Sequence, residues 1–375
     1  MKHLFLILLS ITGLFAIGPT KVATFDRALW SEPINSKSTF NKASRHEIIS
    51  YVNQIINTDL STKKKIKAFV FRKKVSVDSV NRWKAFTQKN LLSNFQEAQK
   101  SCKKNEALCS KVSTWQELVN VATAYTPNEK HKAWYDASQT FFSYYLYEQA
   151  RLAALFPKVT SEIEKLDDSA MQGFNYKDGE FLLTFDDGPK YARTKAITEM
   201  LRQKEIHGLF FVLGNNLEAS VKKYGSKKIA NLYKGSCVGS HGFVHKSHQH
   251  LKSWQSSYDK TRDLIKSNGL NSSAIWFRPP YGQRHKALIN HLAKLGDAVM
   301  LWNIDSQDWN RKLTAKKIED RVLTLMLLHR KGIILFHDIH PKAIKVVEAL
   351  NVYRGESIEW VDCRNVEPIG VERLK

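Results

Sequence analysis

The spacing of apolar residues changes once along this chain, near residues 172–179. Between about residue 46 and residue 170, apolar residues recur every three to four positions, which is typical of helices packed on a shared core. Turn-forming residues separate four predicted helices, at His46–Ile56, Val80–Gln99, Ser113–Ala124 and Lys132–Leu155. We interpret the many aromatic residues of the last helix as helix core, with a sugar-stacking surface as the alternative.

Beyond residue 179, short apolar runs alternate with amphipathic stretches. The apolar runs predict strands at Phe181–Phe185, Gly208–Leu213, Cys237–Ser240, Ala274–Phe277, Ala298–Ile304, Gly332–Phe336 and Ile358–Val361. The stretches between them predict helices that include Thr194–Lys204, Trp254–Asn268, Lys286–Leu295, Ala315–Leu328 and Lys342–Leu350. Strands that alternate with helices form a parallel sheet, which is either open or closed.

Candidate chemistry lies at the ends of two of these runs. The first run ends in Thr184-Phe185-Asp186-Asp187-Gly188-Pro189, and the third is followed by His241-Gly242-Phe243-Val244-His245. Asp187, His241 and His245 can hold a divalent metal and leave positions open for water and substrate. Zinc suits this ligand set best, and cobalt, nickel or manganese would also fit. Asp186 would then stay unligated beside the metal, as a general base.

Three further polar motifs follow in order: Arg278-Pro279-Pro280-Tyr281-Gly282, Asp305-Ser306-Gln307-Asp308-Trp309 and Leu335-Phe336-His337-Asp338. With these five motifs, residues 176–375 resemble the polysaccharide deacetylases, the NodB-homology group also known as carbohydrate esterase family four. The chain departs from the family pattern at Gly242, where the family usually has Ser or Thr.

The resemblance implies roles for several residues of these three further motifs. His337 would be the general acid, Asp308 would keep it cationic, and Arg278 would orient Asp186. The backbone N–H of Tyr281 would be an oxyanion donor. Trp309 and Leu335 would line a pocket for an acetyl methyl group, with plain barrel core as the alternative for both.

The positions of the motifs favour a closed parallel sheet over an open one. Each reactive group follows the C-terminal end of a different predicted strand, and in a (β/α) barrel these ends share one face. Six or seven strands fit in the available length, so we expect an α/β fold with a distorted, incomplete (β/α) barrel at 176–375. A mostly α-helical, basic N-terminal domain at 46–172 would precede it.

The charge of the chain is strongly positive. Its 375 residues include 58 lysines and arginines against 36 acidic residues, a net charge of +22, and residues 37–100 alone carry +10. This excess favours an anionic partner such as an envelope polymer, with solubility as the simpler interpretation. The basic runs lack interleaved aromatic residues, so we expect no nucleic acid partner.

The N-terminus has the pattern of a secretory signal. Lys2 precedes an apolar run from Leu4 to Ile17, which predicts a signal peptide at 1–18, a linker at 19–45 and no stable membrane span. We therefore expect an exported protein that is periplasmic, attached to the envelope or secreted. An uncleaved anchor is the alternative.

The chain also contains four cysteines, and three histidines near the motifs that are not proposed as metal ligands. Export permits disulfides, and Cys102 and Cys109 can pair only if the chain turns between them. Cys237 is interpreted as a buried core thiol rather than a metal ligand, and pairing with Cys363 stays open. Three other histidines lie near the motifs but are not among the proposed metal ligands: His248, His250 and His340. We interpret them as rim or surface residues.

These observations predict an exported, metal-dependent enzyme that removes N-acetyl groups from an N-acetylhexosamine polymer. Peptidoglycan, chitin-type oligomers and exopolysaccharide are the candidate substrates. The alternatives are an O-deacetylase of the acetyl-xylan type and a non-catalytic protein that binds cell wall through its basic helices. Nucleic-acid binding would require that the protein is not exported.

Overall fold

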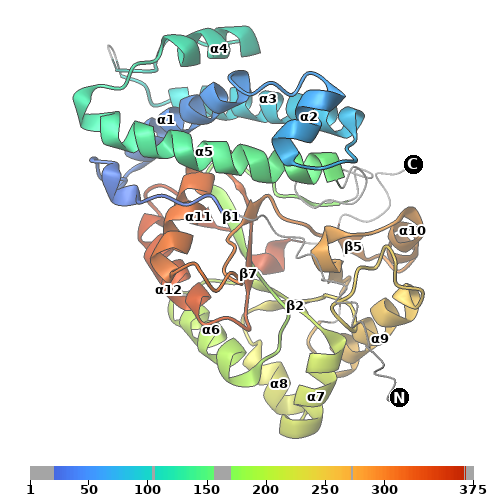
Figure 1. Ribbon diagram of the computed structural model, residues 1–375. Helices are drawn as coiled ribbons and strands as arrows, with labels where there is room; N and C mark the ends of the chain where they lie inside the picture. The colour runs from blue at the N-terminus through green and yellow to red at the C-terminus, as the bar shows by residue number, and fades with distance from the viewer. Residues whose placement is uncertain (1–20, 104–105, 156–169, 272, 367, 369–375) are drawn as a thin grey trace, which may run out of the picture.

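The computed structural model describes residues 21–103, 106–155, 170–271, 273–366 and 368. Figure 1 shows two stacked parts: a helical layer, coloured blue to green, above a sheet that is surrounded by helices. The predicted signal peptide at 1–18 lies outside the described residues. Within the described part of the chain, no helix has both the length and the apolar character needed to cross a membrane.

The helical layer contains five α-helices in the described residues. They are α1 (Lys37–Ile56), α2 (Lys63–Val70), α3 (Val77–Gln99), α4 (Trp115–Ala124) and α5 (Glu129–Leu155). The aromatic residues of α5 include Trp134, Phe141 and Phe142, whose side chains are fully buried. The interpretation as helix core is therefore confirmed for these residues and for Tyr145, whereas the half-buried members of the cluster are Tyr135, Tyr144 and Tyr147.

The predicted linker at 19–45 is wrong at its C-terminal end. Residues 37–45 form the first turns of α1, which begins after a capping box between Ser36 and Thr39. Arg45 is buried and paired with Glu106 at 2.5 Å. A buried arginine hides the apolar spacing of this helix, which is why the pattern predicted a start only at residue 46. The short helix α2 was not predicted, because only Ile66 and Val70 of its eight residues are buried.

Eight parallel strands follow in the part of the chain that the structure describes: β1 (Glu180–Asp186), β2 (Leu209–Val212), β3 (Cys237–Ser240), β4 (Trp276–Phe277), β5 (Ala298–Val299), β6 (Ile304–Asp305), β7 (Gly332–His337) and β8 (Glu359–Trp360). Their order is β5-β4-β3-β2-β1-β7-β6, and β8 also pairs with β1. The described connections between the strands contain the α-helices α6 (Tyr191–Gln203), α7 (Gly214–Tyr224), α8 (Ser226–Leu232), α9 (Trp254–Ser267), α10 (Lys286–Lys294), α11 (Ala315–His329) and α12 (Lys342–Leu350). Among them, α7 and α8 were not predicted.

The connection between β5 and β6 shows that the sheet curls. These strands occupy opposite ends of the strand order, yet only residues 300–303 separate them. An extended chain spans at most about 3.6 Å per residue, so the five steps from Val299 to Ile304 cover at most about 18 Å. The two edges of the sheet must therefore approach each other. The predicted distorted, incomplete barrel is therefore confirmed. The single strand predicted at Ala298–Ile304 is wrong, because the run divides where the chain crosses between these edges.

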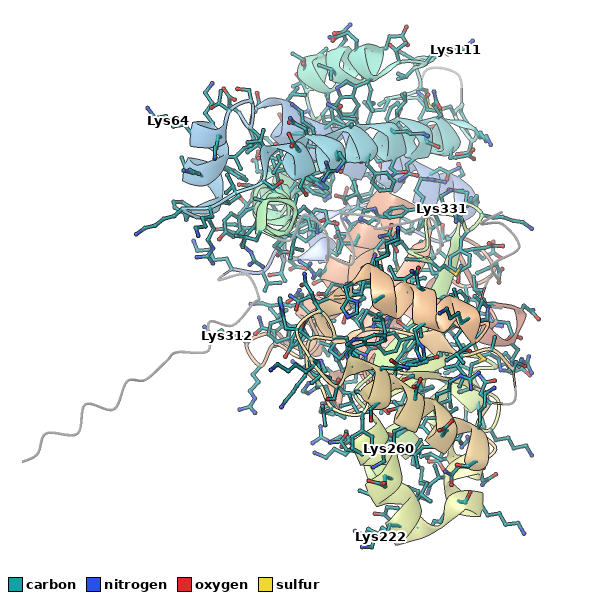
Figure 2. The ribbon with its side chains drawn as sticks, turned by 90° about the vertical axis from the view of Figure 1, so that its right-hand side faces the viewer. Lys64, Lys111, Lys222, Lys260, Lys312 and Lys331 are labelled. Carbon is teal, nitrogen blue, oxygen red and sulfur yellow. A yellow bond between two sulfur atoms is a disulfide. The ribbon has the colours of Figure 1, made fainter. Side chains whose placement is uncertain are left out.

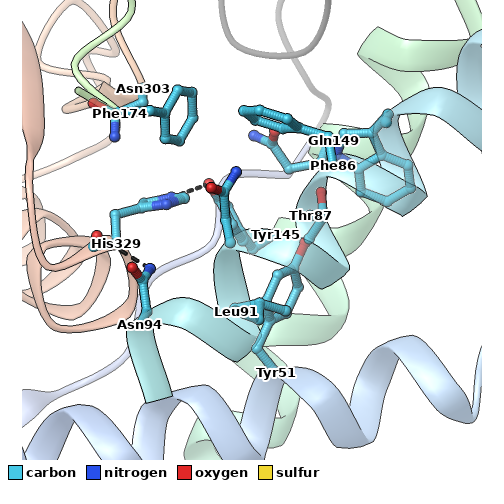
Figure 3. A pocket seen from close by; sticks show the side chains of 12 residues that line it. Tyr51, Phe86, Thr87, Leu91, Asn94, Tyr145, Gln149, Phe174, Asn303 and His329 are labelled. Atoms are coloured by element: carbon cyan, nitrogen blue, oxygen red, sulfur yellow. Dashed lines mark hydrogen bonds between the residues drawn. The ribbon is translucent and has the colours of Figure 1, made fainter. Parts of the chain in front are cut away.

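Helix α11 joins the two parts by packing against α1 and α3. Side chains of the helical layer bind its C-terminal carbonyl groups: Ser44 Oγ donates to Leu327 at 2.6 Å, and Asn94 donates to Leu328 at 3.0 Å. Figure 3 shows Asn94 and Tyr145 reaching His329 in a small pocket lined by residues from both parts. The helical layer is thus attached to the barrel through polar contacts as well as apolar packing.

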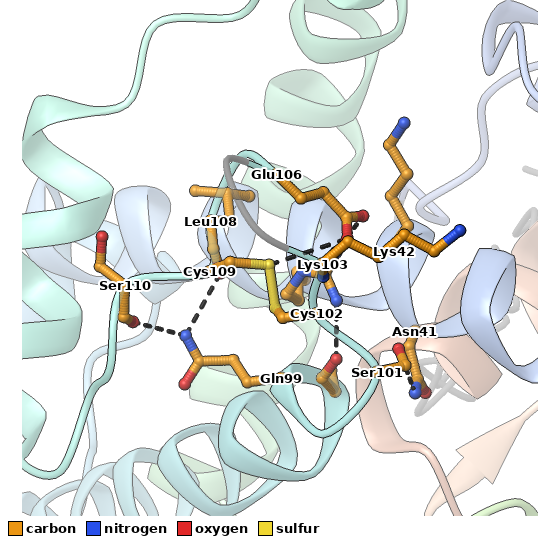
Figure 4. The surroundings of a disulfide bond; sticks show 12 residues. Asn41, Lys42, Gln99, Ser101, Cys102, Lys103, Glu106, Leu108, Cys109 and Ser110 are labelled. Carbon is orange, nitrogen blue, oxygen red and sulfur yellow. Dashed lines mark hydrogen bonds and ion pairs between the residues drawn. A yellow bond between two sulfur atoms is a disulfide. The ribbon is translucent and has the colours of Figure 1, made fainter.

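All four cysteines form disulfides. Cys102 pairs with Cys109, and the chain turns between them (Figure 4). Cys237 pairs with Cys363, the pairing that the sequence left open, so Cys237 is a half-buried disulfide cysteine and not a buried thiol. The pairing could not be found from the sequence because 126 residues separate the two cysteines, and only the sheet brings them together.

Candidate active site

Asp186 and Asp187 lie at the C-terminal end of β1 and point to different surroundings. Asp186 is the last residue of the strand and is 2% exposed. Asp187 has a φ of 76°, so the strand ends between the two residues. Both carboxylates still face His241 Nε2, which lies 3.9 Å from Asp186 Oδ2 and 3.5 Å from Asp187 Oδ1.

Asp187, His241 and His245 come together in the structure. Asp187 Oδ1 lies 3.5 Å from His241 Nε2 and 3.7 Å from His245 Nε2, and the three donor atoms all lie within 4.8 Å of one another. Asp187 Oδ1 is buried and has no hydrogen-bond partner among the described residues. An orphaned carboxylate oxygen facing two imidazole nitrogens fits a divalent cation.

The two imidazoles are prepared for metal binding. His241 Nδ1 lies 2.7 Å from the carbonyl oxygen of Arg278, so a proton on Nδ1 leaves the Nε2 lone pair directed at Asp187. Burial lowers the pKa of His241, and His245 lowers it further. Burial also lowers the pKa of His245. Both shifts favour the neutral imidazole, which is the form that binds metal.

The segment between these histidines is a loop. Gly242 has a φ of 79°, and a Cβ at this position would overlap the imidazole of His248. His248 is fully buried, and its Nε2 lies 3.1 Å from Ser257 Oγ, which accepts a hydrogen bond from the Phe243 N–H at 2.8 Å. The interpretation of His248 as a rim residue is therefore wrong. Its imidazole fills the space left by Gly242 and supports the loop.

The other two extra histidines lie where they were expected. His250 is exposed and His340 is half-buried. Neither belongs to the group of three donors described above.

Asp186 is held by a buried arginine. Arg278 Nη1 donates to Asp186 Oδ1 at 2.8 Å and to Thr184 Oγ1 at 2.8 Å, and Nη2 donates to the Leu301 carbonyl at 2.9 Å. Burial raises the pKa of Asp186 to about 6, although the Arg278 guanidinium opposes this shift. A carboxyl group with this pKa accepts a proton effectively near neutral pH.

His337 lies beside Asp186, on the neighbouring strand. The two residues are partners in the β1–β7 register. Asp308 Oδ1 lies 2.7 Å from His337 Nδ1, and Asp308 Oδ2 accepts the His337 backbone N–H at 2.9 Å. Burial alone would lower the pKa of His337, but the Asp308 carboxylate and the nearby Asp187 and Asp186 raise it to about 10. His337 is therefore cationic at neutral pH.

The three predicted pocket residues differ in exposure. Tyr281 is 45% exposed, has a φ of 62°, and its ring contacts that of His245 edge-on with centroids 4.6 Å apart. Trp309 is 38% exposed, which argues against its being barrel core, whereas Leu335 is 4% exposed within β7.

Sequence reasoning missed one buried acid beside this group. Asp338 is fully buried and accepts a hydrogen bond from Thr194 Oγ1 at 2.7 Å. A Cβ at Gly188 would overlap its carboxylate, so the Gly-Pro turn after β1 also makes room for this side chain. Asp338 belongs to the fifth motif, and an acid directly after His337 was the available signal.

Comparisons with known proteins agree with this geometry. The family model described as polysaccharide deacetylase matches residues 175–300. The chain is 31% identical over 211 residues to a peptidoglycan-N-acetylglucosamine deacetylase of Bacillus cereus, covering 53% of this chain and 73% of the relative. It is 34% identical over 195 residues to the peptidoglycan-N-acetylmuramic acid deacetylase PdaC of Bacillus subtilis, and the match covers 51% of this chain and 39% of that relative.

A third relative has a different substrate in its name. The chain is 30% identical over 165 residues to a chitooligosaccharide deacetylase of Azorhizobium caulinodans, covering 42% of this chain and 73% of the relative. The matched region, the parallel incomplete barrel and the convergence of five motifs at the strand ends together show that this chain belongs to the polysaccharide deacetylase family.

Proposed function

We propose that this protein is an exported, metal-dependent deacetylase that hydrolyses N-acetyl groups of an N-acetylhexosamine polymer. The observation that carries the proposal is the placement of a buried carboxylate and a cationic imidazole, Asp186 and His337, on adjacent strands beside three metal-binding side chains. Peptidoglycan, chitin-type oligomers and exopolysaccharide are the substrate classes, and the names of the relatives support the first two.

Asp187, His241 and His245 would hold the metal, which we propose to be zinc, with cobalt, nickel or manganese as other ions that the ligand set accepts. A divalent ion held there would supply Lewis-acid chemistry, polarising the acetyl carbonyl and lowering the pKa of water to about 7. All further steps use groups of the protein itself.

Asp186 would take a proton from the attacking water while the oxygen of that water bonds to the acetyl carbon. Arg278 keeps the Asp186 carboxylate oriented through a 2.8 Å hydrogen bond. His337 would then donate its proton to the amide nitrogen as the carbon–nitrogen bond breaks, releasing acetate and leaving a free amine on the sugar. Asp308 supports this role because it keeps His337 protonated until that step.

Three residues would bind the acetyl group during this reaction. The backbone N–H of Tyr281 would stabilise negative charge on the carbonyl oxygen. Leu335 would contact the acetyl methyl group, and Trp309, which is more exposed, would cover it from the solvent side.

The basic surface supports an anionic envelope polymer as a further partner. Lys63 and Lys64 on α2 are exposed, and so are Arg72 to Lys74 next to Phe71, which is itself 78% exposed. Figure 2 shows labelled lysines on the barrel as well as on the helical layer, so positive charge covers both parts. Attraction of this kind weakens as salt is added.

Acetate release from N-acetylglucosamine oligomers tests the proposed function. We expect Asp186→Asn and His241→Ala to lose more than about 100-fold in rate, with or without added zinc. Asp259→Asn is the matched control, because Asp259 pairs with His291 outside the proposed site. Equal rates in all four proteins would contradict the catalytic assignment.

A further inference from the structure

A buried ion pair connects the helical layer to the barrel. Glu148 on α5 accepts two hydrogen bonds from Arg321 on α11, at 3.2 Å from Nη1 and 2.7 Å from Nη2. Glu148 is 3% exposed and Arg321 is 1% exposed. Residues before α1 complete the contact, because Ala23 N–H donates to Glu148 at 2.7 Å and its carbonyl accepts from Arg321 at 3.0 Å. Both charged groups are thus held in one orientation.

The third donor of the guanidinium reaches the sheet. Arg321 Nε donates to the carbonyl oxygen of Asp305, the last residue of β6, at 2.9 Å. The Asp305 carboxylate in turn accepts hydrogen bonds from Gln307, at 2.8 Å from the backbone N–H and 2.8 Å from the side-chain amide. Gln307 has a φ of 60°, which is unfavourable for a residue with a side chain. Contacts from Asp305 therefore hold a strained turn in place.

This turn carries the partner of the proposed general acid. Asp308 follows Gln307 directly, is fully buried, and binds His337 through both carboxylate oxygens. We infer that Glu148, through Arg321 and Asp305, is a positioning residue for the Asp308–His337 pair, an inference that rests on the deacetylase function proposed above. The helical layer then contributes to catalysis and does more than bind a partner.

A second contact across the same interface lies away from this turn. Arg330 donates to Asn41 on α1 at 2.6 Å, just before β7 begins at Gly332. His337 lies five positions after Gly332 along β7, about 16 Å at the usual rise of a strand. Asn41 is therefore a control that weakens the interface without touching the turn at 305–308.

The first test compares Glu148→Gln with Asn41→Ala in the full chain, using acetate release from a soluble N-acetylglucosamine oligomer. Glutamine keeps the shape of Glu148 but removes the charge that orients Arg321. We expect kcat to fall about 10- to 100-fold with KM within about twofold of wild type, because small displacements of catalytic groups have effects of this size. Asn41→Ala should keep kcat within about twofold.

Arg321→Lys is the second variant and decides the question if Glu148→Gln does not fold. Lysine keeps a positive charge beside Glu148 but lacks the Nε–H that binds Asp305. We expect the same loss of kcat. Each variant is also combined with Asp308→Asn, and the two losses should be much less than additive, because both changes act on His337 through the same turn.

Equal kcat values for Glu148→Gln and Asn41→Ala, or additive losses with Asp308→Asn, would overturn the inference. If the wild-type protein releases no acetate, the proposed function fails, and imidazole NMR signals still test the positioning. The His337 ring signals, assigned by their loss in His337→Gln, should shift in Glu148→Gln and stay unchanged in Asn41→Ala. Unchanged signals in both variants would also overturn it.

Discussion

Replacing Asp308 by asparagine should move the alkaline limit of activity to lower pH. Asparagine retains the size of the side chain and an oxygen that can accept the His337 backbone N–H, but it removes the negative charge 2.7 Å from His337 Nδ1. Burial then lowers the pKa of His337 with less opposition, because only Asp186 and Asp187 still favour the cation. The proposed general acid would lose its proton at a much lower pH.

The size of the effect follows from the pKa of His337. In the wild-type protein this pKa is about 10, so His337 is almost fully protonated at pH 8. If the pKa in Asp308→Asn falls to the ordinary value of about 6.5, only about 3% of the imidazole keeps its proton at pH 8. We therefore expect kcat of Asp308→Asn at pH 8 to be about 30-fold below kcat of the wild-type protein at the same pH.

The assay is kcat for acetate release measured from pH 5 to pH 11. The wild-type rate should rise through pH 6 or below, where Asp186 loses its proton, since a bound cation lowers the pKa of about 6 that burial gives this group. The rate should fall at pH 10 or below, where His337 becomes neutral, since the bound cation also opposes the raised pKa of this imidazole. Asp259→Asn, which breaks a similar Asp–His pair at His291, should keep the wild-type profile. An unchanged alkaline limit in Asp308→Asn would refute the assignment of His337 as the acid.

Three further predictions concern the metal, the loop and the disulfides. Chelation with EDTA should abolish acetate release and added zinc should restore it, and full activity after verified metal removal would rule out a metal requirement. Gly242→Ala should lower the free energy of unfolding by about 2 kcal/mol, because it combines an unfavourable φ with overlap on His248; thermal denaturation measures this, and His248→Ala in the same chain should recover part of the loss. Chemical denaturation should show that the free energy of unfolding falls by about 5 kcal/mol in Cys237→Ser and by about 2 kcal/mol in Cys102→Ser. The reason is that the two disulfides close loops of 126 and 7 residues. Equal losses in the two variants would argue against the loop-entropy explanation.

Much of the barrel could be predicted from local patterns. The runs at Phe181–Phe185, Cys237–Ser240 and Gly332–Phe336 agree with β1, β3 and β7 to within a residue at each end. These strands are buried, so continuous apolar residues mark them. The patterns failed where local signals conflict with tertiary contacts. In α1 the buried Arg45 conceals only the first turns of the helix, and between β5 and β6 one apolar run serves two edges of the sheet.

The residues of the candidate site were predictable for a related reason. In a parallel barrel, polar residues that follow apolar strands converge on one face, so motif and strand end together locate Asp187, His241 and His337. The same reasoning misplaced His248, whose burial depends on the space beside Gly242 and on Ser257, nine residues further along the chain. A histidine in a polar stretch carries no local signal of being buried.

By itself, the sequence determined the family, the order of the strands along the chain and the side chains available for metal and proton transfer, because these depend on residue type and short-range spacing. Only the tertiary structure decided which cysteines pair, how His248 supports the metal loop and that Glu148 reaches the turn carrying Asp308. Glu148 and Arg321 are 173 residues apart. Contacts of this range arise from how whole elements pack, and no spacing rule within one element encodes them.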